Sequence, residues 1–270
     1  MHSAWRILVR GSGDIGSAVA HRLYKSGYAV ALHDSPLPMV TRRKMSFADA
    51  IFDGNTTLEA VQARRVNNLS ILRGILIQPT FIPVLVGDFN RLLSKLRPHI
   101  LVDARMRKHS QPERQIHLAP FTIGLGPNFT AGHTVHTAIE TAWGERLGQA
   151  FTHGSTRPLE GEPISIEGHS RDRYVYAPVA GKLSTSHQIG DVVTEGQEIA
   201  RIGGTILHAP ICGILRGLTH DGVPVAIKTK IIEVDPRLEH AQISGIPPRP
   251  ARIAESVLTT IQNWEASHAH

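Results

Sequence analysis

The sequence predicts an α/β protein with a mostly parallel sheet, followed by a small all-β module. Three observations lead to this prediction. Short apolar runs alternate with helical patterns through residues 1–153, which is typical of parallel βαβ units. Residues 154–172 are polar and contain glycine, as expected of a linker. Residues 173–236 contain an internal repeat, and residues 237–270 form a tail with one predicted helix.

The order of elements in the first part follows from its apolar runs. The first strand is predicted over Ile7–Val9, and an amphipathic helix from Ile15 to Ser26 is ended by Gly27. The pattern is weaker over residues 41–73, where we assign no element. Further strands are predicted at Tyr28–Leu32, Ile82–Val86, His99–Asp103 and Phe121–Leu125, and further helices at Phe89–Leu96, His133–Trp143 and Ile253–Ile261.

A glycine-rich turn, Gly11-Ser12-Gly13-Asp14-Ile15-Gly16, follows the first strand and opens the first helix. Such a turn lets backbone N–H groups approach a pyrophosphate at the helix N-terminus. Asp34 ends the next strand 18 residues after Gly16, where an acidic side chain can bind a ribose hydroxyl. This context predicts a Rossmann-like domain that binds a nucleotide-type ligand; the alternative is a turn needed only for close helix packing. The predicted binding residues here are Gly11, Gly13, Asp14, Gly16 and Asp34.

A second glycine-rich turn, residues 124–132, lies between a predicted strand and a predicted helix and is interpreted as another phosphate cradle. On that helix His136 and Glu140 are one turn apart and share a face. Asp103 ends a strand between the two turns, and ligands bind at the carboxyl ends of such strands. We therefore expect Asp103, His136 and Glu140 to be catalytic residues around one crevice; the alternative is a pair exposed to solvent. The predicted binding residues of this turn are Gly124, Gly126, Thr130 and Gly132.

The chain is basic, with 29 Lys and Arg residues against 23 Asp and Glu residues, a net charge of +6. This excess suits phosphates as well as nucleic acid. Arg42, Arg43 and Lys108 are expected either to neutralise a phosphorylated ligand or simply to be solvated. Aromatic residues make up only 5%, which argues against stacking on single-stranded nucleic acid, and no nucleic-acid partner is expected.

Several classes of protein are excluded by simple features of the sequence. The apolar stretch from Gly74 to Gly87 is interrupted by Gln78, Pro79 and Pro83, so no membrane span is expected. The single cysteine, Cys212, excludes an internal disulfide and is expected to be a buried thiol in a strand. The histidines form no HExxH cluster, and no metal site is expected. We expect a cytoplasmic protein.

The second part of the chain repeats itself at a period of 32 residues. Ala177-Pro178 to Leu183 aligns with Ala209-Pro210 to Leu215, which indicates two copies of one β unit. The pattern resembles the barrel-sandwich hybrid fold of biotinyl and lipoyl carrier domains. Those domains carry a modified lysine on a hairpin where this chain has Gly203-Gly204-Thr205. No covalent biotin or lipoate is therefore expected, and docking or homo-oligomerisation is the remaining role.

Five segments together resemble the selenium-dependent molybdenum hydroxylase maturation family. The resemblance runs along nearly the whole chain, although Ser12 and Asn128 stand where the family often has glycine. It implies an accessory role for a molybdenum hydroxylase client, without an assigned reaction. The segments are Val9–Asp14, Thr41–Ala50, Leu101–Ala104, Gly124–Gly132 and Val135–Thr141.

The predicted function combines the resemblance with the two glycine-rich turns. We expect an accessory protein for maturation of that hydroxylase, which binds a molybdopterin- or nucleotide-type ligand through its phosphate. One alternative is an NAD(P)-dependent oxidoreductase, although no Tyr-x-x-x-Lys pair is evident. Another is a non-catalytic scaffold that docks the hydroxylase. Whether the protein catalyses a reaction stays open at this point.

Overall fold

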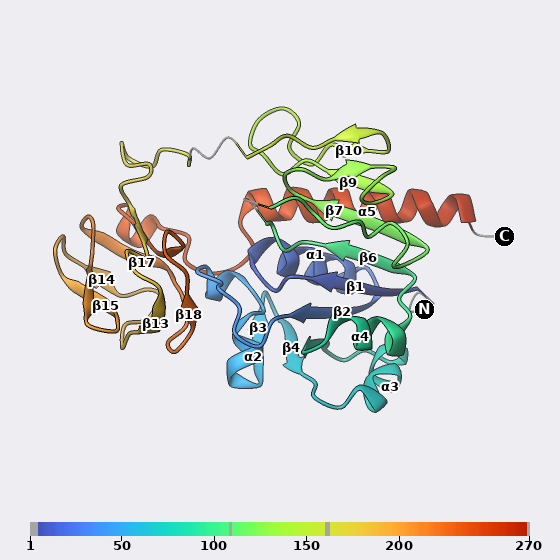
Figure 1. The fold of residues 1–270 in the computed structure, drawn as a ribbon, viewed down its shortest axis with the longest axis horizontal. Coiled ribbons are helices and arrows are strands. Elements are labelled where there is room, and N and C mark those ends of the chain that lie inside the picture. The colour runs from blue at the N-terminus through green and yellow to red at the C-terminus, as the bar shows by residue number, and fades with distance from the viewer. Residues whose placement is uncertain (1–4, 108–109, 160–162, 269–270) are drawn as a thin grey trace.

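The computed structural model describes residues 5–107, 110–159 and 163–268. Figure 1 shows a large sheet with helices on both faces, which we call the sheet unit, beside a smaller group of strands, which we call the β unit. Among the described residues, no helix is both long enough and apolar enough to cross a membrane. The helices are α1 (Asp14–Lys25), α2 (Asp49–Asp53), α3 (Leu72–Ile77), α4 (Phe89–Leu96) and α5 (Pro248–His268).

The large sheet has nine strands in the order β10-β9-β7-β6-β1-β2-β5-β4-β3. Its central strands pair in parallel, whereas β3 with β4 and β10 with β9 pair antiparallel at the two edges. The bounds are β1 (Arg6–Arg10), β2 (Ala29–Asp34), β3 (Asn55–Leu58), β4 (Val61–Arg65), β5 (Ile82–Val86), β6 (Ile100–Asp103), β7 (Phe121–Leu125), β9 (Thr137–Ile139) and β10 (Ala150–Phe151).

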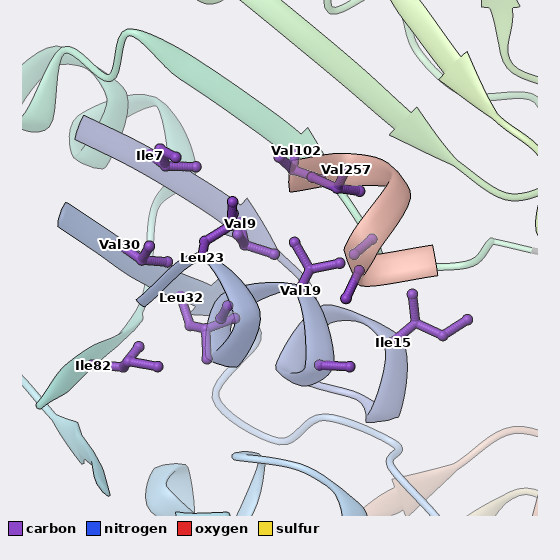
Figure 2. Close-up of a cluster of buried hydrophobic side chains, with 14 of the residues drawn as sticks. Ile7, Val9, Ile15, Val19, Leu23, Val30, Leu32, Ile82, Val102 and Val257 are labelled. Atoms are coloured by element: carbon purple, nitrogen blue, oxygen red, sulfur yellow. The ribbon is translucent and has the colours of Figure 1, made fainter. Parts of the chain in front are cut away.

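Alternate residues of the central strands point to opposite faces of the sheet and belong to two separate hydrophobic cores. In β1, Ile7 and Val9 face α1 and α5 (Figure 2), whereas Leu8 packs with residues of α3 and α4 on the opposite face. This alternation is the period of two that a strand imposes. Because both faces are covered, the parallel strands read as nearly continuous apolar runs. Burying each of these Val, Leu or Ile side chains stabilises the fold by about 1.5–3 kcal/mol.

The helix α5 belongs to the sheet unit, although it follows the β unit in the chain. Ile253, Val257 and Ile261 recur every four residues and are buried against α1, which explains why this segment is an amphipathic helix. Tyr28 donates a hydrogen bond to Glu265 at 2.8 Å. The sheet unit is therefore completed by the C-terminal part of the chain.

The β unit consists of two four-stranded antiparallel sheets, ordered β12-β19-β17-β14 and β16-β15-β13-β18. The repeat is confirmed by the positions of the strands. β13, β14 and β15 begin 32 residues before β17, β18 and β19, respectively. β14 pairs with β17 and β13 with β18, so the two copies interlock. The bounds are β12 (Tyr174–Tyr176), β13 (Gly181–Ser184), β14 (Val192–Val193), β15 (Glu198–Ile202), β16 (Thr205–His208), β17 (Gly213–Leu218), β18 (Pro224–Val225) and β19 (Lys230–Asp235).

The predicted fold class, a Rossmann-like mostly parallel sheet followed by a barrel-sandwich hybrid module, is wrong. The large sheet is mixed, because hairpin-type pairings extend both of its edges. The β unit is two separate antiparallel sheets that share no strand. The predicted helix His133–Trp143 is also wrong: β9 forms there and pairs in parallel with β7.

Candidate functional site

The first glycine turn is held closed from within. A Cβ atom on Gly16 would lie 2.0 Å from the Gly11 carbonyl oxygen, and one on Gly11 would lie 2.9 Å from the Ala104 carbonyl oxygen. Gly11 also has φ +103°, a conformation that favours glycine. A Cβ on Gly13 would meet no heavy atom within 4 Å. Gly11 and Gly16 thus serve close packing of α1 on the sheet, and only Gly13 borders open space.

Asp34 binds this turn directly. Its Oδ2 atom accepts hydrogen bonds from the Ser12 N–H at 2.6 Å and from the Ser12 hydroxyl at 2.7 Å. Its Oδ1 atom accepts from the Ser35 N–H at 2.7 Å. The carboxylate is therefore already engaged at the place where a ribose hydroxyl was expected.

The basic run Arg42-Arg43-Lys44 joins the two units of the protein. Arg42 bonds to Glu233, and also lies 3.3 Å from the Asp14 carboxylate at the start of α1. The Arg43 Nε atom donates to the Leu218 carbonyl at 2.8 Å, and the Lys44 Nζ atom donates to the Ile189 carbonyl at 2.5 Å. Asp14, Arg42 and Arg43 therefore make internal contacts, and Lys108 lies outside the described residues.

Glu233 is the centre of that junction. Its side chain has no exposed surface and accepts hydrogen bonds from four cations: Arg42, Arg173, Arg216 and Lys230. Burial opposes its charged form, but these cations outweigh the burial and hold the pKa of Glu233 well below its usual range. A carboxylate with this many internal partners stabilises the junction and offers no free acceptor to a ligand.

A second charged cluster lies at the carboxyl edge, the edge where the parallel strands of the large sheet end. Arg10 ends β1 and Asp103 ends β6, opposite one another in register. Asp103 is 2% exposed, and Arg105 donates to both of its oxygens, from Nε at 3.0 Å and from Nη2 at 2.6 Å. Gln115 adds a hydrogen bond of 2.6 Å. Burial would raise the pKa of Asp103, but Arg105 and Arg10 outweigh it and the pKa is lowered.

Three arginines converge on one further carboxylate in this cluster. Glu113 accepts from Arg10 Nη1 at 2.9 Å and from Arg105 Nη2 at 2.5 Å, and it also pairs with Arg107. We call Arg10, Arg105 and Arg107 the arginine cluster. Partial burial opposes the charge on Glu113, but hydrogen bonds from Arg105 and Arg107 lower its pKa to about 2. Three cations thus face two carboxylates, an excess of positive charge at the edge where ligands bind in α/β sheets.

Arg10 is the most buried member of the arginine cluster. It is 7% exposed, and its guanidinium carbon lies 3.5 Å from the centre of the Phe89 ring. Its Nη1 atom also donates to the Gln115 side chain at 2.9 Å, while its buried Nε atom has no hydrogen-bond partner. Stacking on an aromatic face fixes the plane of a guanidinium group. Arg10 is therefore a positioned cation with spare donor capacity.

His136 and Glu140 are not brought together as expected. They flank β9, four residues apart in extended chain, which separates them by about 13 Å along the strand. Glu140 is buried and accepts from the N–H groups of Thr141, Ala142 and Arg157. The His136 Nδ1 atom lies 3.1 Å from the Thr122 N–H, and burial lowers the pKa of His136. Glu140 lies at the carboxyl edge with Asp103, and His136 lies at the other end of its strand.

The second glycine turn is filled by its own side chains. A Cβ on Gly124 would lie 2.3 Å from the Phe129 ring, and the Gly126 carbonyl accepts from the Thr156 hydroxyl at 2.6 Å. Gly132 has φ +76° in a turn, and the Thr130 hydroxyl lies 2.8 Å from the Ser155 hydroxyl, where β8 (Thr130–Ala131) pairs with β11 (Gly154–Ser155). These contacts leave the turn closed and do not form an open cradle for phosphate.

The arginine cluster was missed by the sequence analysis, although Arg105 and Arg107 alternate directly after the strand that ends at Asp103. Cys212 was expected to be buried and is exposed, in the turn before β17. Among the described residues, no three His, Cys, Asp or Glu side chains are grouped so as to hold a metal ion. A hollow of about 710 Å³ lies between residues 145–149 and α5, away from the arginine cluster.

The chain is similar to one curated protein along most of its length. It is 40% identical over 255 residues to the uncharacterized protein YqeB of Escherichia coli K12, a match that covers 94% of this chain and 47% of YqeB. The chain thus spans about half the length of the curated relative that it matches. No family model matches the chain.

Solved structures give weaker matches. A succinylglutamate desuccinylase/aspartoacylase family protein of Shewanella amazonensis is 10% identical, with a TM-score of 0.25, and covers 87% of this chain and 92% of its own. The ectoine utilization protein EutE of Ruegeria pomeroyi is 11% identical, with a TM-score of 0.26, and covers 87% of each chain. At such TM-scores these solved structures carry no argument about the chemistry of this chain. The expectation of a Rossmann-type nucleotide-binding protein of molybdenum-cofactor maturation is wrong in its fold, because the large sheet is mixed and both glycine turns are closed by their own contacts.

Proposed function

We propose that this relative of YqeB binds a phosphate-bearing small molecule at the carboxyl edge of its nine-stranded sheet, through the arginine cluster. The observation that carries the proposal is the convergence of Arg10, Arg105 and Arg107 on a single carboxylate, Glu113. Guanidinium groups present several donors in a fixed plane, which suits the oxygens of phosphate and carboxylate groups.

The charge balance supports an anionic ligand. The arginine cluster carries three positive charges, whereas Asp103 and Glu113 together carry two negative charges. The buried Nε atom of Arg10 is a donor without a partner among the described residues. Buried donors without partners cost free energy, so Arg10 is held in place by its surroundings at this cost.

The same geometry favours binding over proton transfer. Asp103 and Glu140 are both engaged in internal hydrogen bonds, and the lowered pKa of Asp103 makes it a weak base near neutral pH. His136 lies away from the arginine cluster. We therefore propose a binding or accessory role for this site.

Partners and location rest on the sequence alone. A client enzyme of the molybdenum hydroxylase type, a homo-oligomer and a cytoplasmic location stay predictions that no contact within this chain tests.

The proposal is tested by isothermal titration calorimetry at low ionic strength, with inorganic pyrophosphate, adenosine monophosphate and NAD as probes. Arg105→Lys keeps a positive charge beside Asp103 but lacks the two-pronged donor. We expect it to weaken binding of the phosphate probes by about tenfold or more. Arg201→Lys, an exposed arginine paired with Glu198 in the β unit, is the matched control and should bind like the wild type. Absence of binding by the wild type and all variants, or equal binding by Arg105→Lys, would overturn the proposal.

A further inference from the structure

We infer that the Glu113 carboxylate is an internal substitute for the anionic group of the ligand, which enters the arginine cluster by exchanging with Glu113. The inference rests on the proposed function and adds how the site is filled before a ligand arrives. It predicts that removing the negative charge of Glu113 makes the protein bind its ligand more tightly.

The two carboxylates of the cluster differ in how firmly they are held. Asp103 is 2% exposed, ends a central strand, and is bound by both Arg105 and Gln115. Glu113 has a side chain that is 43% exposed and lies on the loop between β6 and β7. Among the described residues, the hydrogen bonds and ion pairs that hold the Glu113 side chain come from the arginine cluster. Asp103 is therefore a fixed, buried part of the site, whereas the Glu113 side chain is partly exposed to solvent and can be displaced.

The positions of the donors match a ligand anion. Arg10 and Arg105 both reach the same oxygen, Oε1, at 2.9 and 2.5 Å, and Arg107 pairs with Oε2. Charge-assisted bonds of this length are typical of carboxylates and of phosphates. A phosphate group in the place of Glu113 would keep these donors satisfied.

Exchange keeps the charge balance that the cluster requires. Without Glu113 or a ligand, three arginines would face Asp103 alone, and one of them, Arg10, is buried. Uncompensated buried charge is strongly unfavourable. The loop carboxylate thus neutralises the empty site and must be displaced when an external anion binds.

Simple competition sets the size of the effect. If Glu113 occupies the arginines for nine-tenths of the time, only about one-tenth of the molecules are open, and the apparent Kd is about tenfold above its intrinsic value. Glu113→Gln removes the charge at similar side-chain size, and Glu113→Ala removes the acceptor altogether. Both substitutions are at a partly exposed loop position, and circular dichroism checks that each variant is folded.

The experiment titrates wild type, Glu113→Gln, Glu113→Ala and Arg105→Lys with inorganic pyrophosphate by calorimetry. Glu239→Gln is the matched control for net charge, because its side chain is 86% exposed on the β unit. We expect the two Glu113 variants to bind pyrophosphate about tenfold or more tightly than wild type, and Glu239→Gln to match wild type.

The remaining outcomes separate this inference from the proposed function. Equal or weaker binding by both Glu113 variants, with binding lost in Arg105→Lys, would keep the anion site and overturn the role of Glu113. Tighter binding that appears equally in Glu239→Gln would be a general charge effect and would also overturn it. No binding by any form, including both Glu113 variants, would overturn the proposed function itself.

Discussion

Arg42 of the sheet unit donates hydrogen bonds from Nε and Nη2 to the two carboxylate oxygens of Glu233 in the β unit, each 3.1 Å long. This bidentate pair crosses the junction between the two units, and Asp14 at the start of α1 contacts the same guanidinium group. The two units are thus connected by charge as well as by chain.

The junction predicts a large loss of stability in Glu233→Gln. Removing the carboxylate leaves four cations around a buried site, and breaking buried pairs of this kind costs about 3–5 kcal/mol. Denaturant unfolding followed by circular dichroism measures the loss. Glu239→Gln should change the free energy of unfolding by less than about 0.5 kcal/mol. Equal stability of the two variants would contradict the importance of the junction.

The glycines of the first turn predict losses of stability of different size for the same substitution. Gly16→Ala places a Cβ 2.0 Å from a backbone oxygen, so the helix must move, and we expect a loss of about 3 kcal/mol or more. Gly13→Ala meets open space and should cost about 1 kcal/mol or less. Thermal unfolding of both variants checks this pair. A Gly16→Ala protein as stable as Gly13→Ala would show that the turn is looser than its contacts indicate.

The lowered pKa values of three carboxyl groups predict that the folded protein loses stability at low pH. The pKa of Glu113 in the folded chain is about 2, below its ordinary value of 4.5, and the pKa values of Asp103 and Glu233 are also lowered. A carboxyl group with a depressed folded pKa contributes stability above its unfolded pKa and loses it as pH falls through the folded pKa. The free energy of unfolding should therefore decrease from about pH 4.5 towards pH 2. Glu113→Gln should flatten part of this slope, and an unchanged slope would contradict the assignment.

His136→Ala should leave ligand binding unchanged. His136 lies at the opposite end of β9 from Glu140, which is at the carboxyl edge. We expect the affinity for pyrophosphate to stay within about twofold of wild type, a difference of roughly 0.4 kcal/mol. Calorimetry on the variant measures it directly, and a tenfold loss would place His136 in the site after all.

The β unit should not be biotinylated or lipoylated. The hairpin between β15 and β16 turns at Gly203 and Gly204, and it carries no lysine. Lys230 is bound to Glu233, while Lys182 lies within β13. Intact-mass measurement after expression with active ligases should show no added group, and an adduct on Lys182, Lys228 or Lys230 would overturn this expectation.

Much of the sheet unit was predictable because its elements carry strong local patterns. The strands Ile82–Val86 and Phe121–Leu125 and the helix Phe89–Leu96 lie where the apolar runs and the amphipathic period indicate. The helix expected at His133–Trp143 failed because its spacing of polar residues resembles a helix face. The buried residues Thr137, Ala138 and Ile139 instead pair with β7, and this tertiary pairing outweighs the local preference.

The candidate site was harder to predict, since its members are distant in sequence. Arg10 and Glu113 are 103 residues apart and meet only because β1 and β6 are neighbours and the loop after β6 returns over the sheet edge. The glycine turns were identified as ligand cradles, but a sequence pattern does not reveal whether a side chain such as Phe129 or Asp34 already fills the space. That depends on the packing of residues far along the chain.

The return of α5 to the sheet unit has a consequence for how the protein is synthesised. Ile253, Val257 and Ile261 cover α1, whose own residues leave the ribosome more than two hundred residues earlier. During translation the apolar surface of α1 stays open until the whole β unit has emerged. The β unit has a hydrophobic core of its own, so it can fold before α5 packs against α1. Closure of the larger core is then a late event, because it depends on α5.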